Sequence, residues 1–127
     1  FDEINQFEQE IAANGVTIVK IMLHISAEEQ RQRLLARLDD PTKRWKFNPG
    51  DLDDRALWNG FGRAYTDVLQ RCDRDVAPWY VVPADRKWYR DWAVLNVLLA
   101  TLARMRLEYP PAAFDVAQQR DRLRNEG

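Results

Sequence analysis

The chain has 127 residues, 46% of them hydrophobic and five of them tryptophan, which is enough apolar material for one folded domain. Its 19 Lys and Arg side chains nearly balance its 20 Asp and Glu side chains, so net charge favours neither a nucleic-acid nor an acidic partner. One cysteine and one histidine exclude a disulfide framework and the usual zinc clusters. The apolar runs 16–25 and 93–103 are too short or too interrupted to cross about 30 Å of bilayer. With no signal peptide before them, we expect a cytoplasmic protein without a membrane partner.

The first 25 residues predict an amphipathic helix followed by a buried strand. Residues 3–14 place apolar side chains at helical spacing, and Gly15 follows where a helix end favours a residue that tolerates positive φ. Residues 16–25 are β-branched and almost continuously apolar, which is typical of a parallel strand covered on both faces. His24 lies near the end of this strand, where we favour a structural side chain over a catalytic one.

A second helix and a long loop come next. Ser26 and Glu29 match a capping box, which predicts a helix over residues 27–38. Residues 39–53 contain two prolines and a glycine and show no sustained period, so we predict a loop. A loop of this length usually has a function.

The following helix is predicted from about Asp53 to Cys72. Gly60 and Gly62 each cost this helix about 1 kcal/mol relative to alanine, so we expect close packing or a bend there. We interpret Cys72 as an ordinary thiol rather than a nucleophile. Residues 79–82 then predict a short buried strand.

A turn at residues 83–85 leads into a last long helix, predicted from about Lys87 to Arg106. One helical stripe of this segment is apolar and consists of Trp88, Trp92, Leu95, Leu99 and Leu102. We interpret four tryptophans as packing in the core or against the long loop: Trp45, Trp79, Trp88 and Trp92. Residues 110–127 begin with two prolines and predict a charged tail.

Two parallel strands cannot form a stable doubly wound sheet, because its strands need neighbours and two helical layers. We therefore expect the remaining strands upstream of Phe1. The chain begins with phenylalanine rather than methionine, which agrees with a truncated or processed chain.

Positive charge is concentrated in residues 31–46, which hold six basic side chains against two acidic ones. Arg33 and Arg37 are four residues apart, so they project from one face of the predicted helix. The remaining basic side chains are Arg31, Lys43, Arg44 and Lys46, the last three of them in the loop. The planar guanidinium of arginine can donate two hydrogen bonds to a phosphate, and lysine adds a compact positive charge. A solvated helix face is nevertheless the simpler explanation of such a run of basic residues.

Five segments of this chain resemble, in order and spacing, the polyphosphate kinase 2 family. They are INQFEQEI, LHISAEEQRQRLLARLDDPTKRWKF, DLDDRALW, AYTDVL and APWYVVPADRKWYR, and the match covers roughly Ile4 to Met105. These are long ordered motifs rather than scattered matching letters, and the resemblance covers most of the chain.

The resemblance implies an α/β fold, namely the C-terminal portion of a P-loop kinase-like three-layer α/β/α domain with parallel strands and a basic lid. On this basis residues 1–109 belong to the domain, the lid spans about 37–53, and 110–127 form a C-terminal tail. The implied activity transfers phosphoryl groups between inorganic polyphosphate and a nucleotide of the ADP, AMP or GDP class, with Mg²⁺. We also expect a homo-oligomer and a partnership with the N-terminal remainder of the domain.

The resemblance also assigns roles to single residues. The residues implied to line the polyphosphate channel are Arg37, Lys43, Arg44 and Lys46, with Arg33 a weaker candidate. Asp85 and Lys87 follow the second strand, near the edge where ligands of open α/β sheets bind. For Asp85 a role as N-cap of the last helix is an equal alternative. For Arg90 a surface salt bridge is favoured over ligand contact.

A phosphate loop needs glycine-rich backbone with a lysine and a magnesium ligand, and the glycines of this chain never form that motif. We therefore assign no metal ligand or catalytic residue here, expect both upstream, and expect the isolated chain to be inactive. Two departures from the family pattern, the helix glycines and Arg86, leave the nucleotide preference open.

Two other functions compete with the kinase assignment. One is a non-catalytic module that binds polyphosphate or stabilises a partner domain. The other is nucleic-acid binding through residues 31–46, which lacks both a basic overall charge and a recognised reader fold.

Overall fold

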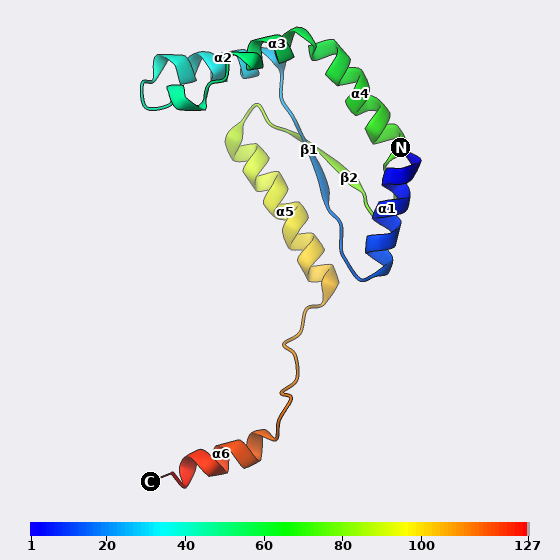
Figure 1. The fold of residues 1–127 in the computed structure, drawn as a ribbon, viewed down its shortest axis with the longest axis vertical. Helices are drawn as coiled ribbons and strands as arrows, with labels where there is room; N and C mark the ends of the chain where they lie inside the picture. Colours follow the sequence, from blue (N-terminus) through cyan, green and yellow to red (C-terminus); the bar gives the residue numbers. More distant parts are fainter. Residues whose placement is uncertain (127) are drawn as a thin grey trace.

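The computed structural model describes residues 1–126 and has an α/β fold, as predicted (Figure 1). Its elements, in chain order, are α1 (Asp2–Ala13), β1 (Lys20–His24), α2 (Ala27–Asp39), the 3₁₀ turn η1 (Arg44–Lys46), α3 (Gly50–Ala56), α4 (Trp58–Arg71), β2 (Trp79–Pro83), α5 (Lys87–Met105) and α6 (Val116–Arg124). No helix within these residues is both long and apolar enough to span a membrane.

The two strands pair in parallel, with Lys20 opposite Trp79 and His24 opposite Pro83. The pairing extends one step further, because the backbone N–H of Ala84 donates to the His24 carbonyl at 2.8 Å. Since the strands run in the same direction and end at the same level, the turns that follow them emerge side by side. These two turns form the carboxyl edge of the sheet.

Helices lie on both sides of the strands. Figure 1 shows α5 on one side, α1 and α4 on the other, and α2 with α3 beyond the carboxyl edge. α5 contacts β2. Its more buried face consists of Ala93, Val94, Val97 and Thr101, of which Thr101 is buried and the others are half-buried.

The apolar core of the described residues is small. Its buried apolar members are Leu34, Cys72, Ala77, Val82 and Ala84. Much larger apolar side chains are exposed on the strands and on the helices beside them, as at Leu23, Val81, Phe7 and Phe61. Residues 1–126 therefore leave apolar faces of the sheet and its helices uncovered, as expected of two strands alone.

A buried charged cluster lies at the amino end of the sheet. The Lys20 ammonium donates to Glu8 Oε2 at 2.7 Å and to the Cys72 carbonyl at 2.6 Å, and it lies 5.3 Å from the centre of the Trp79 ring. The side chains of Lys20 and Glu8 are each only 11% exposed. We call this cluster of Lys20, Glu8, the Cys72 carbonyl and Trp79 the Lys20 hub. It connects α1, β1, the end of α4 and β2.

The structure corrects two of the predicted elements. The strand expected over 16–25 is confined to Lys20–His24, where β2 supplies backbone partners. The helix expected from Asp53 to Cys72 is two helices that break at Leu57 rather than at the glycines. A Cβ added at Gly60 or Gly62 would meet nothing within 4 Å, so neither glycine serves close packing within these residues.

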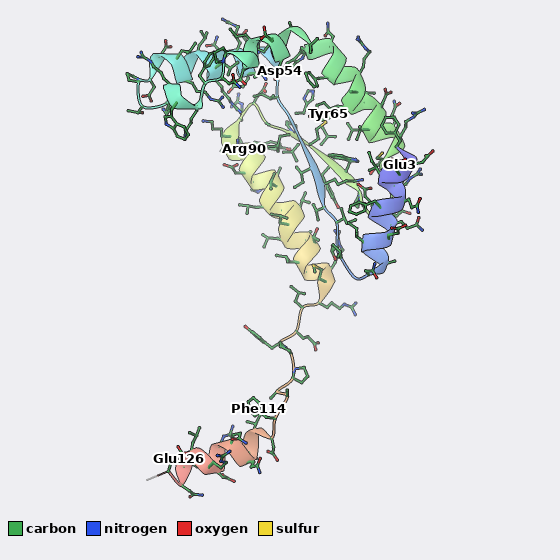
Figure 2. All side chains as sticks on the ribbon, viewed as in Figure 1. Glu3, Asp54, Tyr65, Arg90, Phe114 and Glu126 are labelled. Carbon is green, nitrogen blue, oxygen red and sulfur yellow. The ribbon has the colours of Figure 1, made fainter. Side chains whose placement is uncertain are left out.

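The tail and the tryptophans also differ from expectation. Residues 116–124 form α6, which begins when Asp115 Oδ1 accepts from the Gln118 N–H at 3.0 Å. Figures 1 and 2 show α6 well away from the rest of the molecule. Trp45, Trp88 and Trp92 are 78%, 66% and 56% exposed, so within the described residues they are not core side chains.

Candidate functional site

The two turns of the carboxyl edge are joined by side chains. Ser26 caps α2 as predicted, because its hydroxyl accepts from the Glu29 N–H at 3.1 Å. The second half of the predicted capping box is different, since the Ser26 N–H donates to Asp85 Oδ1 at 2.7 Å rather than to Glu29. Asp85 therefore completes the helix cap from the other turn, 59 residues along the chain.

Arg33 holds the same two turns together. Its Nε donates to Glu29 Oε1 at 2.8 Å, and its Nη2 donates to the carbonyls of Ala84 and Asp85 at 2.8 and 2.9 Å. We call the set of Ser26, Glu29, Arg33 and Asp85 the strand-end clamp. The guanidinium of Arg33 already donates three hydrogen bonds. Its role here is therefore structural, because it connects α2 to the second turn.

The expectation that Asp85 caps the last helix is wrong. The N-cap of α5 is Arg86, and no side chain makes the capping bond. The Ser26 backbone N–H, above all, lowers the pKa of Asp85 below its ordinary value, and the charge of Arg33 adds to the effect. Asp85 is therefore an anion whose carboxylate is already directed at Ser26.

Asp40 organises the start of the basic loop, which we define as residues 40–49. Its Oδ1 accepts from the N–H and the hydroxyl of Thr42 at 2.9 and 2.7 Å, and its Oδ2 pairs with the Lys43 ammonium at 2.6 Å. Lys43 first, and then Thr42, lowers the pKa of Asp40 to about 2. The turn is thus held by a carboxylate that stays ionised at any ordinary pH.

The rest of the basic loop is also internally bonded. Arg44 Nε donates to the Leu38 carbonyl at 2.8 Å and so satisfies an end of α2. Trp45 Nε1 donates to the Thr42 carbonyl at 3.0 Å, and the Lys46 ammonium lies 5.0 Å from the Trp45 ring centre. Lys43, Arg44 and Lys46 are all exposed, so the loop presents three cations to solvent from a fixed backbone.

Arg37 lies between the basic loop and the strand-end clamp. Its Nη1 is 3.9 Å from Asp51 Oδ2 of α3, and its side chain is 40% exposed. A hollow of about 360 Å³ between α2 and α3 is lined by Arg37 and Arg33, but also by Asp51 and Asp54. Its acidic side chains make this hollow a poor anion site.

The predicted site residues therefore fall into two groups about one helix apart. Arg33, Asp85 and Lys87 lie at the carboxyl edge, whereas Lys43, Arg44 and Lys46 lie at the far end of α2. The 13 residues of α2 extend about 20 Å. An extended chain of phosphates is the kind of ligand that could lie along both groups.

Sequence reasoning missed part of the carboxyl edge. A hollow of about 340 Å³ there is lined by His24 and Ser26 with Asp85, Arg86, Trp88 and Tyr89. Lys87 is exposed in the first turn of α5 at this same edge. The signal for Arg86 and Tyr89 was their position directly after a parallel strand, where ligands gather. Arg90, by contrast, pairs with Asp91 at 2.7 Å, as predicted.

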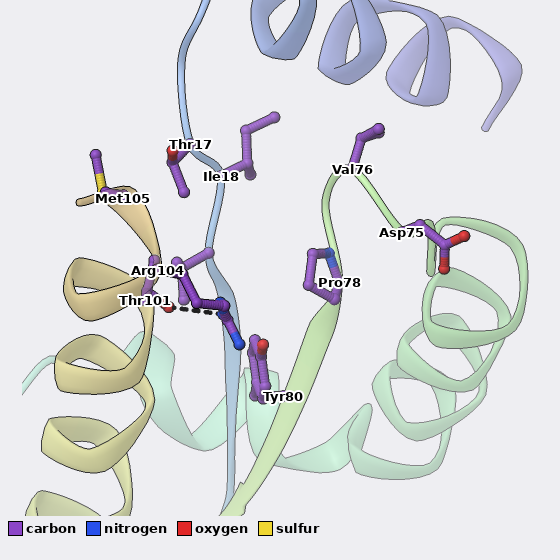
Figure 3. Close-up of a pocket in the computed structure, with 10 residues that line it drawn as sticks. Thr17, Ile18, Asp75, Val76, Pro78, Tyr80, Thr101, Arg104 and Met105 are labelled. Atoms are coloured by element: carbon purple, nitrogen blue, oxygen red, sulfur yellow. Dashed lines mark hydrogen bonds between the residues drawn. The ribbon is translucent and has the colours of Figure 1, made fainter.

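A separate hollow of about 400 Å³ lies at the opposite, amino end of the strands, between α5 and the segment before β1 (Figure 3). Its arginine, Arg104, already donates to the Thr101 hydroxyl at 3.2 Å. Ligands of open parallel sheets bind at the carboxyl edge, so this hollow is not our candidate.

The residues that the structure describes do not fit a magnesium ion. Within residues 1–126, no three His, Cys, Asp or Glu side chains lie together as metal ligands would. Asp40, at the start of the basic loop, is instead paired with the Lys43 ammonium. No part of the chemistry of this chain is therefore derived through a metal.

The comparisons with known proteins agree on one family. The polyphosphate kinase 2 family model matches residues 1–110. Over 110 residues, the chain is 48% identical to an AMP/ADP-polyphosphate phosphotransferase of Meiothermus ruber, covering 87% of this chain and 41% of that protein. It is 41% identical to an ADP-polyphosphate phosphotransferase of Rhodopseudomonas palustris, covering 87% of this chain and 38% of that protein.

A solved structure extends the match to the fold. The crystal structure of polyphosphate kinase 2 from Arthrobacter aurescens TC1 superposes with a TM-score of 0.91 at 47% identity, covering 96% of this chain and 43% of that one. The chain spans about two fifths of the length of these relatives. On the evidence of its sequence and its fold alike, the chain belongs to the polyphosphate kinase 2 family.

Proposed function

We propose that this chain is the C-terminal part of a polyphosphate-dependent nucleotide kinase. The parent enzyme transfers phosphoryl groups between inorganic polyphosphate and a nucleoside mono- or diphosphate. The names of the Meiothermus and Rhodopseudomonas relatives support the reaction. The observation that carries the proposal is the basic loop, which presents Lys43, Arg44 and Lys46 to solvent on a backbone fixed by Asp40.

The basic loop suits a polyphosphate chain better than a single small anion. Polyphosphate carries negative charge on every unit, so several exposed cations can bind it at once without a deep pocket. The ammonium of Lys43 can exchange its partner Asp40 for a phosphate, because water screens the attraction between the two partly exposed side chains. We therefore assign this loop, with Arg37, as the lid that holds the phosphate donor.

The carboxyl edge completes the proposed site. Lys87 is an exposed cation there, as is Arg86, and we place Lys87 toward the phosphates of the nucleotide or the near end of the polyphosphate. Arg33 and Asp85 hold the turns that position Lys87 and α2. In this assignment the two groups of cations contact one extended ligand.

The fold that we propose for the parent domain is a P-loop kinase-like three-layer α/β/α sandwich. Its support is the parallel pairing of β1 with β2, the helices on both sides, and the exposed apolar side chains of the strands. The phosphate loop and the Mg²⁺ ligands then come from the N-terminal remainder. Mg²⁺ would supply charge neutralisation of the transferred phosphoryl group, while the residues described here bind and orient the polyphosphate.

A coupled assay of nucleotide formation from polyphosphate tests the proposal. The protein encoded by the whole gene should be active, and residues 1–127 alone should not. Polyphosphate binding by the whole protein without nucleotide formation would instead identify the non-catalytic module.

The lid has its own test, in the whole protein. Replacing both lysines, Lys43→Ala with Lys46→Ala, should raise the KM for polyphosphate roughly tenfold, about 0.7 kcal/mol for each exposed contact. It should also flatten the dependence of KM on ionic strength, because fewer screened charge contacts remain. As a matched control, Arg120→Ala with Arg122→Ala removes two charges from α6 and should change neither. An unchanged KM in the lysine variant across a salt series contradicts the lid assignment.

A further inference from the structure

One face of α4 has a gap at Gly62. Trp58, Gly62 and Thr66 follow one another at intervals of four residues, so they lie on one face of this helix. A Cβ added at Gly62 would meet no packing partner within 4 Å among residues 1–126. The face therefore has an open notch between Trp58 and Thr66. Glycine inside a helix is less stable than alanine, so helix formation alone does not account for this notch.

The notch opens into two adjoining hollows. One, of about 350 Å³, lies between α4, α3 and the end of β1, and the other, of about 620 Å³, extends along α4 to Asp67. Both are lined by His24, Trp58 and Gly62. We call these two spaces together the α4 hollow. Each has a volume typical of a small-molecule site, about 300–1,000 Å³.

Hydrogen bonds fix the walls of the α4 hollow. Arg55 lines its smaller part, and Nη1 of this side chain donates to the Ala27 carbonyl at 3.0 Å and to Gln30 Oε1 at 2.6 Å. These bonds hold α3 against the first turn of α2. On α4, Thr66 Oγ1 donates to the Gly62 carbonyl at 2.9 Å, which fixes the hydroxyl beside the notch. The walls that α2, α3 and α4 supply are therefore preformed.

The lining of the α4 hollow is partly aromatic. Its aromatic members are Trp58, Phe61 and Tyr65. Figure 2 shows Tyr65 on the side of α4 that faces β1. Aromatic side chains can stack on any nucleobase, because every base has a π face.

The charged side chains of the α4 hollow balance one another. They are Arg55 and Arg63, against Asp54 and Asp67. A space with two carboxylates and two guanidinium groups attracts a bare phosphate weakly, but its polar atoms can bond the edge of a base or the hydroxyls of a ribose. The lining thus suits the uncharged part of a nucleotide.

His24 connects the α4 hollow to the carboxyl edge. It lines both parts of the α4 hollow, and it also lines the hollow that contains Asp85 and Arg86. Arg86 and Lys87 are exposed cations at the start of α5, whereas the aromatic lining belongs to α4. A nucleotide is anionic at one end and aromatic at the other, which matches this division.

We propose that the α4 hollow binds the nucleoside part of the nucleotide substrate, with the base in the notch at Gly62. The assignment rests on the proposed kinase function, which supplies the nucleotide. The base lies against the aromatic side chains of Trp58 and Tyr65. The phosphates then extend past His24 toward the cations at the start of α5.

A nucleoside explains the notch better than a segment of the protein's own chain does. Part of the lining is polar, and its members are Asn59, Arg63, Thr66 and Asp67. Elements that complete a domain bury mainly apolar side chains, and burial of these polar groups without partners would be unfavourable. The α4 hollow also lies where ligands of open parallel sheets bind, at the carboxyl ends of the strands.

The two helix glycines provide the test and its matched control, in the whole protein. Gly62→Ala and Gly60→Ala each add one methyl group to α4, and neither methyl meets a packing partner among residues 1–126. Only Gly62 lines the α4 hollow. Both variants should raise the melting temperature of the ligand-free protein by about 2–4 °C, because alanine favours the helix. Gly62→Ala alone should raise the KM for ADP and the calorimetric Kd for ADP about tenfold, with the KM for polyphosphate unchanged.

Two outcomes overturn the proposal. One is an ADP affinity that is equal in Gly62→Ala and Gly60→Ala. The other is a lower melting temperature of Gly62→Ala, because the added methyl would then overlap a segment of the protein's own chain. Failure of the proposed function looks different, since the unmodified whole protein then forms no nucleotide from polyphosphate. Even then, weaker ADP binding by Gly62→Ala alone supports the nucleoside site, because calorimetry needs no turnover.

Tyr65 tests the position of the base. Tyr65→Ala removes the ring and should raise the Kd for ADP about tenfold, whereas Tyr65→Phe keeps the ring and should bind ADP like the unmodified protein. Tyr65 is 47% exposed, so both variants should keep the fold, which circular dichroism checks. Equal losses of affinity in the two variants would assign the contact to the hydroxyl and rule out stacking of the base on this ring.

Discussion

The two ends of the sheet use charge in opposite ways. At the amino end, the Lys20 hub is 11% exposed and every donor contact is internal. At the carboxyl edge and beyond it, Lys43 is 56% exposed, and its partner Asp40 faces the same solvent. Removing a buried and fully paired cation leaves its partners uncompensated and destabilises the fold, whereas an exposed cation on a fixed loop remains available to a ligand. Burial together with pairing, rather than charge alone, separates the two roles.

Replacing Lys20 should have the largest effect on the stability of the protein. Lys20→Met leaves the Glu8 carboxylate and the Cys72 carbonyl without their donor in a buried place. Loss of one partner of a buried pair costs about 3 kcal/mol or more of unfolding free energy. Urea unfolding of the whole protein measures this loss. Adding Glu8→Gln to Lys20→Met should restore part of it, and a double variant no more stable than the single would show that the ion pair is not the cause.

The strand-end clamp should give an intermediate effect on stability and a separate effect on activity. Arg33→Ala removes two charged hydrogen bonds to the second turn and should cost about 1–2 kcal/mol in urea unfolding. Because it loosens α2, which carries the lid, it should also raise the KM for polyphosphate.

Two matched variants identify the role of the clamp. Asp85→Asn keeps an oxygen that can accept from the Ser26 N–H and should resemble the unmodified protein more closely than Asp85→Ala. Equal losses in both Asp85 variants, with KM changed and stability intact, would show that the carboxylate contacts ligand directly instead.

The smallest expected effect is the titration of Asp40. Its pKa of about 2 lies below the ordinary 3.8, so its ion pair is present at neutral pH and is lost only as pH falls toward 2. An NMR titration of the carboxyl carbon measures this midpoint. Lys43→Ala should move the midpoint toward 3.8, and Thr42→Val should move it less, because Lys43 is the larger cause. If Lys43→Ala leaves the midpoint unchanged, the ion pair between Asp40 and Lys43 does not form in solution.

Local signals identified the first helix, both strands and the second and last long helices, though not all of their bounds. The Ser26 cap follows from the capping residues, and the strand predicted over 16–25 and the helix predicted from about 87 to 106 follow from periodicity. The α6 helix also had a signal, since Asp115 precedes Gln118 by three residues, but the neighbouring prolines favoured a tail. The break at Leu57 had no such signal, because no proline or glycine stands there.

The roles of the site residues depended on distant partners. Arg33 matched a phosphate-binding pattern by charge and spacing, yet its guanidinium bonds carbonyls 51 and 52 residues away. Asp85 likewise caps a helix from another turn rather than its own. Neither contact can be inferred from residues close in sequence, since only the parallel register brings the two turns together. Arg37, Lys43, Arg44 and Lys46 remain predicted ligands of polyphosphate.

The thiol of Cys72 can report on local opening at the amino end of the sheet. It is the single cysteine of the chain, it is 1% exposed, and its carbonyl is bonded by Lys20. Because the residue is buried, a thiol-reactive dye can reach this sulfur only when the structure around the end of α4 opens. The rate of labelling in native buffer therefore measures the free energy of that local opening, without any engineered probe.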